Sequence, residues 1–301
     1  MNSGKRQIRL QLLDSRNGRK LFGARHGCEM SQPKALCHFL LDTQTEKVQS
    51  QFVKKPYESH EDEYRRMEAV GTKSWFQRNR PWAVDPHDQH FLEDVFAQPW
   101  APKNGHAMEL GCGTGPLTRW LAKSVLKTTG VDVSKTAIRM ARKQSKSLTI
   151  DYRVADICTK DVRSFGKFDL CVDGRCFHGI TSPKDRRAVL ENVRDLLKPN
   201  GIFILMSMCA PIERSSLARQ YPDQKILRNV IYNPVKRAGA FSGAKKINGQ
   251  QYLPMRFLGH WKFLLSELQK SGLRPLLVRF NHCLPQEPVS SLNVAAVKME
   301  D

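Results

Sequence analysis

A glycine-rich loop between an apolar strand and an amphipathic helix constrains the fold of this chain most strongly. The loop reads Glu109-Leu110-Gly111-Cys112-Gly113-Thr114-Gly115, and apolar residues at helical spacing follow from Leu117. Glycines permit a sharp turn and the close approach of a ligand that side chains would block. The following helix offers unpaired N–H groups and a positive dipole end. The loop therefore predicts a ligand site at the start of a helix.

Strands and helices alternate along the chain and predict one open sheet with helices on both faces. The strands are expected at 107–110, 129–133, 148–154, 168–172 and 202–206. Ser134 is expected to cap the helix after the second of them, and Lys198-Pro199-Asn200-Gly201 to stop the helix of 183–197 in a turn. A helix at 261–270 and strands at 275–280 and 292–298 follow. The pattern predicts an α/β, doubly wound, Rossmann-like, seven-stranded, mostly parallel sheet with an antiparallel C-terminal hairpin.

Two segments do not fit this alternation. Residues 1–60 show weak periodicity and scattered charges, which predict a poorly ordered or loosely folded basic extension before a domain over 61–301. Residues 210–258 form a long connection with several lysines and arginines and with Tyr221. So long a connection inside a compact domain is usually functional, so we expect a lid or substrate insertion there.

The glycine spacing narrows the choice of ligand. A dinucleotide fingerprint reads G-x-G-x-x-G, whereas here the third glycine, Gly115, comes one residue early and Pro116 follows it. The spacing favours a ligand smaller than a pyrophosphate and makes a nicotinamide oxidoreductase the weaker alternative.

The loop resembles motif I of the class I S-adenosylmethionine-dependent methyltransferases, and the later elements follow in that family's order. The resemblance covers residues 70–209 well and 259–299 by topology, and it implies S-adenosylmethionine as the cofactor. In that family an acid after the second strand holds the ribose hydroxyls, and an acid after the third lies near the adenine amino group. The residues that the resemblance implies for cofactor binding are Trp75, Glu109, Gly111, Cys112, Gly113, Gly115, Asp132, Val133, Asp156, Ile157 and Asp173.

Residues 173–180 follow the fourth strand and resemble the segment that lies between cofactor and acceptor in many small-molecule methyltransferases. The resemblance implies that Arg175, His178 and, in the insertion, Tyr221 contact the acceptor. His178 is the candidate general base, with Asp173 next. A histidine packed in the core and an arginine paired with a carboxylate are the alternatives for His178 and Arg175.

Trp75 belongs to the segment Trp75-Phe76-Gln77-Arg78-Asn79-Arg80-Pro81-Trp82. This segment is similar to the entry segment of the thiopurine and tellurite-resistance type of methyltransferase, which covers the methionine end of the cofactor. An aromatic contact with the core is the alternative.

The acceptor class depends on two opposing observations. The segment after strand four and the tryptophan segment favour a small molecule, and the Asn/Asp-Pro-Pro-Tyr and Pro-Cys motifs of nucleic-acid base methylation are absent there. The net charge of +20 keeps RNA or protein as the alternative acceptor. A non-catalytic module that only binds the cofactor is the third hypothesis.

The cysteines and the N-terminus predict the cellular setting. The eight cysteines form no C-x-x-C pair, which favours reduced thiols in a cytoplasmic protein. Cys171, Cys176 and His178 match no common zinc spacing, so no metal is expected. The chain lacks both an apolar run of about 20 residues and the apolar core of a secretory signal. The oligomeric state stays open.

Overall fold

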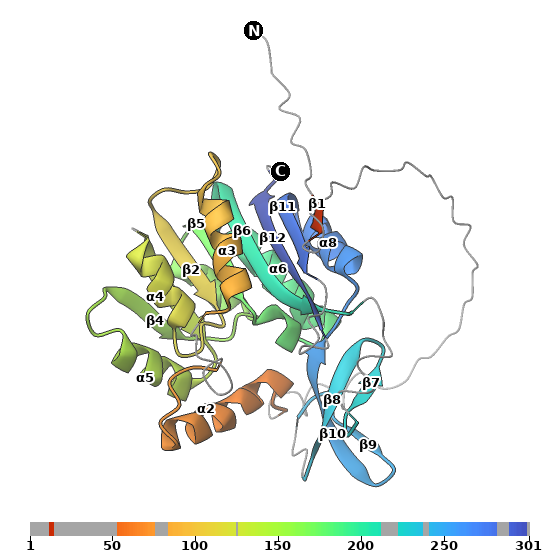
Figure 1. The fold of residues 1–301 in the computed structure, drawn as a ribbon. Coiled ribbons are helices and arrows are strands. Elements are labelled where there is room, and N and C mark those ends of the chain that lie inside the picture. The colour runs from red at the N-terminus through yellow and green to blue at the C-terminus, as the bar shows by residue number, and fades with distance from the viewer. Residues whose placement is uncertain are drawn as a thin grey trace, which may run out of the picture.

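The computed structural model describes residues 12–14, 53–75, 84–124, 126–211, 222–236, 241–281 and 289–299, which build two sheets (Figure 1). The larger sheet has the order β1-β11-β12-β6-β5-β2-β3-β4. Its strands are β1 (Leu12–Asp14), β2 (His106–Leu110), β3 (Lys127–Asp132), β4 (Ile150–Val154), β5 (Phe168–Gly174), β6 (Leu197–Cys209), β11 (Leu273–Asn281) and β12 (Ser290–Lys298).

Seven of these strands confirm the predicted α/β, doubly wound, Rossmann-like sheet. Only β12 among the described strands of this sheet runs antiparallel to its neighbours, β6 and β11. An eighth strand, β1, pairs in parallel with β11 at the edge. The turn expected at residues 198–201 is a bulge inside β6, because Leu197 pairs with Phe168 and Ile202 already pairs with Leu170. Asn200 takes a positive φ of 59° there.

Helices cover both faces of the large sheet (Figure 1). On one face, α3 (Pro86–Phe96) and α4 (Pro116–Lys123) bury Phe91, Leu92 and Leu121 against the strands. On the other, α6 (Pro183–Leu196) and α8 (Trp261–Lys270) bury residues such as Leu190 and Leu264. The short α5 (Lys135–Gln144) packs beside β3 and β4. No helix in the described ranges is long and apolar enough to cross a membrane.

A smaller antiparallel sheet lies within the predicted insertion of residues 210–258, in the order β7-β8-β10-β9. Its strands are β7 (Lys225–Leu227), β8 (Val230–Val235), β9 (Lys245–Ile247) and β10 (Gln250–Phe257). Strand β10 contains a bulge, because Pro254 pairs with Tyr232 and Arg256 pairs with the adjacent Ile231. A role as a lid stays a prediction, and Tyr221 lies outside the described residues.

A segment between β1 and α3 lies across the edge of the large sheet where the parallel strands end. It comprises the 3-10 helix η1 (Pro56–Ser59) and α2 (His60–Ala69), which runs beside α5 (Figure 1). We call residues 55–69 the covering segment. It contains the predicted boundary at residue 60, and Tyr57 upstream of that boundary packs in the main core. Of residues 1–52 the structure describes only 12–14, so the basic extension stays a prediction.

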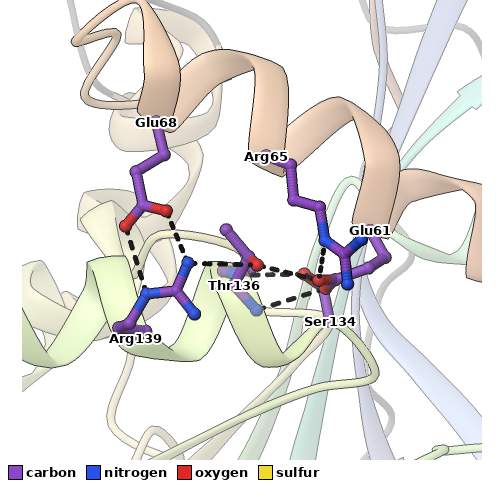
Figure 2. Close-up of polar contacts among 7 residues, drawn as sticks. Glu61, Arg65, Glu68, Ser134, Thr136 and Arg139 are labelled. Carbon is purple, nitrogen blue, oxygen red and sulfur yellow. Dashed lines mark hydrogen bonds and ion pairs between the residues drawn. The ribbon is translucent and has the colours of Figure 1, made fainter.

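Polar contacts attach the covering segment to the start of α5 (Figure 2). Glu61 accepts hydrogen bonds from the hydroxyls of Ser134 (2.6 Å) and Thr136 (2.8 Å), and Glu68 pairs with Arg139. Burial would raise the pKa of Glu61, but these hydrogen bonds and one from Arg65 outweigh it and lower the pKa to about 2. The Glu61 carboxylate therefore completes the N-terminus of α5, where Ser134 is the predicted cap.

Candidate cofactor and acceptor site

The glycine-rich loop depends on glycine both for its conformation and for its packing. Gly111, Gly113 and Gly115 have φ angles of +62°, +53° and +78°, a region that other residues rarely adopt. A Cβ atom at Gly111 would lie 2.2 Å from the Cys176 sulfur. The buried Cys112 donates its backbone N–H to the carbonyl of Val131 (2.9 Å). The loop therefore holds a tight turn against β3.

Asp132 ends β3 and faces the glycine-rich loop. One carboxylate oxygen accepts from the backbone N–H of Gly113 and the other from that of Ser134, each at 2.8 Å. Burial raises the pKa of Asp132 to about 6, although both hydrogen bonds oppose the rise. Two ionised oxygens can accept about four hydrogen bonds, so Asp132 keeps capacity for two hydroxyl groups of a ligand.

Asp156 follows β4 and connects to the covering segment. It accepts from the backbone N–H of Cys158 (2.8 Å) and from the hydroxyl of Tyr57 (2.9 Å). The adjacent Ile157 is buried in the main core, and Val133 packs against that core. The residues expected to hold a nucleoside therefore end at one edge of the sheet, on neighbouring strands.

Two further buried acids lie beside the loop. Asp173 pairs with Leu110 across β5 and β2, next to Glu109. One Asp173 oxygen accepts from the backbone N–H groups of Cys176 (2.9 Å) and Phe177 (3.1 Å), while the other has no partner among the described residues. Burial raises the pKa of Asp173 to about 7 and that of Glu109 to about 8. An unpartnered buried carboxylate oxygen suits a cationic ligand group.

These raised pKa values predict that the ligand-free protein loses stability as pH rises. Asp132, Asp173 and Glu109 hold their protons more tightly folded than unfolded, where such groups titrate near pH 4. The folded state therefore binds more protons between about pH 4 and 8, and the free energy of unfolding falls across that window. Urea unfolding at several pH values measures this slope. Asp173→Asn should flatten it and the exposed Asp151→Asn should not; equal slopes would contradict the assignment.

Tyr64 of the covering segment faces the glycine-rich loop, and Trp75 packs beside Tyr64. The Tyr64 hydroxyl lies so close to Gly113 that a Cβ atom there would come within 2.6 Å of it. Trp75 packs edge-on against His60 and Tyr64, with ring centroids 5.6 and 5.9 Å apart. Trp75 is 37% exposed, so its ring lines the surface beside α2. Its contact with the cofactor stays a prediction.

His178 and Arg175 lie in the turn after β5 but have different surroundings. His178, in the 3-10 helix η4 (Phe177–Gly179), is buried, and its Nδ1 has no partner in the described part of the chain. Burial and the charges of Arg256 and Arg175 lower the pKa of His178 well below its usual value, so the imidazole is neutral at pH 7. Arg175 is buried and forms an ion pair with Asp88 of α3 (2.6 Å). This is the alternative predicted for Arg175 from the sequence, an arginine paired with a carboxylate. A contact of Arg175 with the acceptor stays a prediction.

Arg186 of α6 supports the turn that carries His178. Its side chain is 1% exposed, pairs with Glu267 of α8 (2.6 Å), and donates to the carbonyls of Phe177 (3.1 Å) and Ile180 (3.3 Å). The guanidinium also stacks on the rings of Phe177 and Phe257, 3.8 and 4.3 Å from their centroids. Arg186 thus stabilises η4 by binding one carbonyl before His178 in the chain and one after it.

Sequence reasoning missed Tyr57, Glu61, Tyr64 and Arg186. His60, Tyr64 and Met67 lie at i, i+4 and i+7, and this helical spacing is the signal for a face of α2 that packs on the site. The sequence holds no comparable signal for Arg186, because only the fold brings its helix to Glu267. The described residues contain no group of three histidine, cysteine, aspartate or glutamate side chains placed to hold a metal ion.

The chain resembles known methyltransferases over its central part. Residues 107–201 match a family model described as a methyltransferase domain. The chain is 29% identical over 140 residues to an uncharacterized methyltransferase of Mycobacterium tuberculosis, with 46% of this chain and 66% of that protein covered. It is 28% identical over 131 residues to a non-reducing polyketide synthase of Penicillium brasilianum, with 40% of this chain and 5% of the synthase covered. The chain thus spans less than two thirds of the length of these relatives.

A solved structure shares the fold at low sequence identity. It is the 1,6-didemethyltoxoflavin-N1-methyltransferase of Burkholderia thailandensis, with bound 1,6-didemethyltoxoflavin and S-adenosylhomocysteine. The TM-score is 0.51 at 14% identity, over 88% of this chain and 94% of that one. Residues 107–201 are thus similar to a methyltransferase domain, and the described sheet shares its fold with this S-adenosylhomocysteine-bound methyltransferase.

Proposed function

We propose that this protein transfers the methyl group of S-adenosylmethionine to a small-molecule acceptor. The observation that carries the proposal is the set of acids at one sheet edge, Asp132, Asp156 and Asp173, around a loop whose glycines adopt positive φ angles. Each acid lies at or just after the end of a different parallel strand, the position at which open α/β sheets bind ligands.

The residues present fit the cofactor. Asp132 would accept the two ribose hydroxyls, and Asp156 with Ile157 would hold the adenine. The unpartnered oxygen of Asp173 suits the amino group of the methionine part, which carries a positive charge. Glu109, Cys112 and Val133 would contact the cofactor beside the glycine-rich loop. The roles of these residues and of Trp75 stay predictions of the proposal.

The protein's part in the reaction is orientation and, for a hydroxyl acceptor, removal of one proton. When bound, the cofactor supplies an electrophilic methyl group attached to a sulfonium leaving group. His178 would accept the acceptor proton at its unpartnered Nδ1, because the imidazole is neutral at pH 7 and therefore able to take up a proton. The covering segment and the small sheet would hold the acceptor in line and limit the entry of water.

Support for a small acceptor comes from the enclosure of the site. His178 is buried, His60 of the covering segment lies beside the same turn, and strand β10 contacts η4. The Burkholderia relative in fold acts on a small heterocycle, as its name states. A basic surface favours the second candidate, an RNA or protein acceptor, since the net charge is +20.

The test combines binding with identification of products. Calorimetry with S-adenosylmethionine should show binding of micromolar order to the folded protein. Labelled cofactor and a cell extract, fractionated into metabolites, RNA and protein before mass spectrometry, identify the methylated class. Label in metabolites supports a small acceptor, whereas label in RNA with steep salt dependence supports the second candidate. Absence of cofactor binding would overturn the proposal.

Replacement of His178 by asparagine should lower kcat by roughly 100-fold, the lower end of the usual contribution of a general base. Cofactor affinity should stay within about twofold, since His178 lies on the acceptor side. The rate is measured with the acceptor found in the extract, at a pH where the wild type turns over. An unchanged kcat would leave His178 as a packing residue, the alternative that its sequence context already offered.

A further inference from the structure

We propose that the acceptor carries a carboxylate group that binds Arg256 of the small sheet, beside His178. This inference rests on the proposed function and names the chemical class of its substrate. The geometry begins in β10, which contacts both η4, the turn of His178, and η1 of the covering segment. Strand β10 therefore lies beside both the turn of His178 and the covering segment.

A bulge in β10 determines on which face of the small sheet Arg256 lies. Pro254 and Arg256 pair with the adjacent residues Tyr232 and Ile231, so Met255 is an extra residue in β10. Such bulges change the direction in which the following side chain points and are frequent beside active sites. Without Met255, the alternation of the strand would place position 256 on the other face of the small sheet.

Arg256 has no partner in the described part of the chain. It is half-buried, and it makes no ion pair or hydrogen bond with any described residue. The other arginines around His178 are already neutralised, since Arg175 pairs with Asp88 and Arg186 with Glu267. A half-buried guanidinium without a carboxylate is costly to keep. Because no described residue supplies that carboxylate, we infer that an anionic ligand binds beside Arg256.

The neighbours of Arg256 define what that anion is attached to. Its charge lies close enough to His60 and His178 to lower the pKa of both, after burial itself. Both imidazoles are therefore neutral, and of the three described arginines that act on His178 only Arg256 lacks a carboxylate partner among the described residues. One guanidinium matches one carboxylate in a two-bond pair. The Nδ1 of His178 is unpartnered, and Trp75 with His60 offers aromatic edges, which suits a planar, hydroxylated carboxylic acid.

The experiment uses paired probes that differ only in charge. Full-length protein saturated with S-adenosylhomocysteine is titrated with benzoate, 4-hydroxybenzoate and phenylacetate, and with the amide of each, while NMR follows the histidine ring signals. We expect each carboxylate to bind at least tenfold more tightly than its amide. Arg256→Gln should remove this preference, and Arg256→Lys should retain part of it because the charge remains. Lys246→Gln, an exposed lysine on neighbouring β9, is the matched control and should keep it.

The outcomes separate this inference from the proposed function. If S-adenosylhomocysteine does not bind, the proposed function fails. If it binds but no carboxylate exceeds its amide, or the preference survives in Arg256→Gln, the inference alone is wrong. Tighter binding of phenyl phosphate than of benzoate, lost in Arg256→Gln, would replace the carboxylate by a phosphate. A rise in the pKa of His178 in folded Arg256→Gln verifies independently that the two side chains face each other.

Discussion

Replacement of Asp132 by asparagine should weaken S-adenosylmethionine binding by at least 100-fold, about 2.8 kcal/mol. The carboxylate accepts backbone N–H groups on both oxygens, from Gly113 and Ser134. An asparagine side chain must turn its NH₂ group toward one of these donors, which leaves a buried donor unpaired and shifts the glycine-rich loop. The variant also loses the negative charge proposed to hold the ribose hydroxyls. Calorimetry with S-adenosylhomocysteine gives the affinity directly.

The matched control for this variant is Asp151→Asn. Asp151 is an exposed acid of β4, near in sequence and equal in chemistry. The Asp151→Asn protein should bind the cofactor with the affinity of the wild type. Circular dichroism must show that Asp132→Asn is folded at the temperature of the titration. A folded Asp132→Asn protein with affinity within about threefold of the wild type would place the ribose contact elsewhere.

Replacement of Arg186 by methionine should destabilise the protein by about 3–5 kcal/mol, the usual cost of removing one partner of a buried ion pair. The change leaves the Glu267 carboxylate without its partner and the carbonyls of Phe177 and Ile180 without their donor. It also removes the cation from the faces of Phe177 and Phe257. Urea unfolding followed by tryptophan fluorescence measures the loss.

Arg187 provides the control, because it is the next residue on α6 and is exposed. Arg187→Met should change the free energy of unfolding by less than about 0.5 kcal/mol. A double substitution of Arg186 and Glu267 by methionine and leucine should recover part of the stability, since no buried charge is then left unpaired. Equal effects of Arg186→Met and Arg187→Met would show that the buried pair contributes nothing to the fold.

The large sheet and the acids at its edge could be predicted because their signals are local. The glycine-rich loop, the apolar strands and the amphipathic helices follow each other within residues 106–209. The acids Asp132, Asp156 and Asp173 could be found because each lies at or next to the end of one predicted strand. Side chains at the ends of neighbouring parallel strands must meet at one edge. Asp132, Asp156 and Asp173 therefore lie at the same edge of the sheet, as their order implied, and their roles in cofactor binding stay predictions.

The walls around this edge could not be predicted, because distant pairings form them. Glu61 binds Ser134 and Thr136 more than seventy positions later, and nothing in its own neighbourhood indicates that partner. Strands β7 and β9 have three residues each, too short for a pattern of period two. The partner of Arg175 could not be predicted either, because Asp88 lies on α3, 87 positions earlier in the chain.

The covering segment has a consequence for how long a spent cofactor stays bound. Only Tyr64 and Met67 of α2 are buried, and its other attachments are hydrogen bonds and ion pairs near the surface. Such an element detaches at a small fraction of the cost of opening the sheet beneath it. Tyr64 would leave with α2, while Tyr57 of η1 stays packed in the main core. Release of α2 alone would then uncover the glycine-rich loop, and added salt, by weakening these attachments, would shorten the residence time of the product.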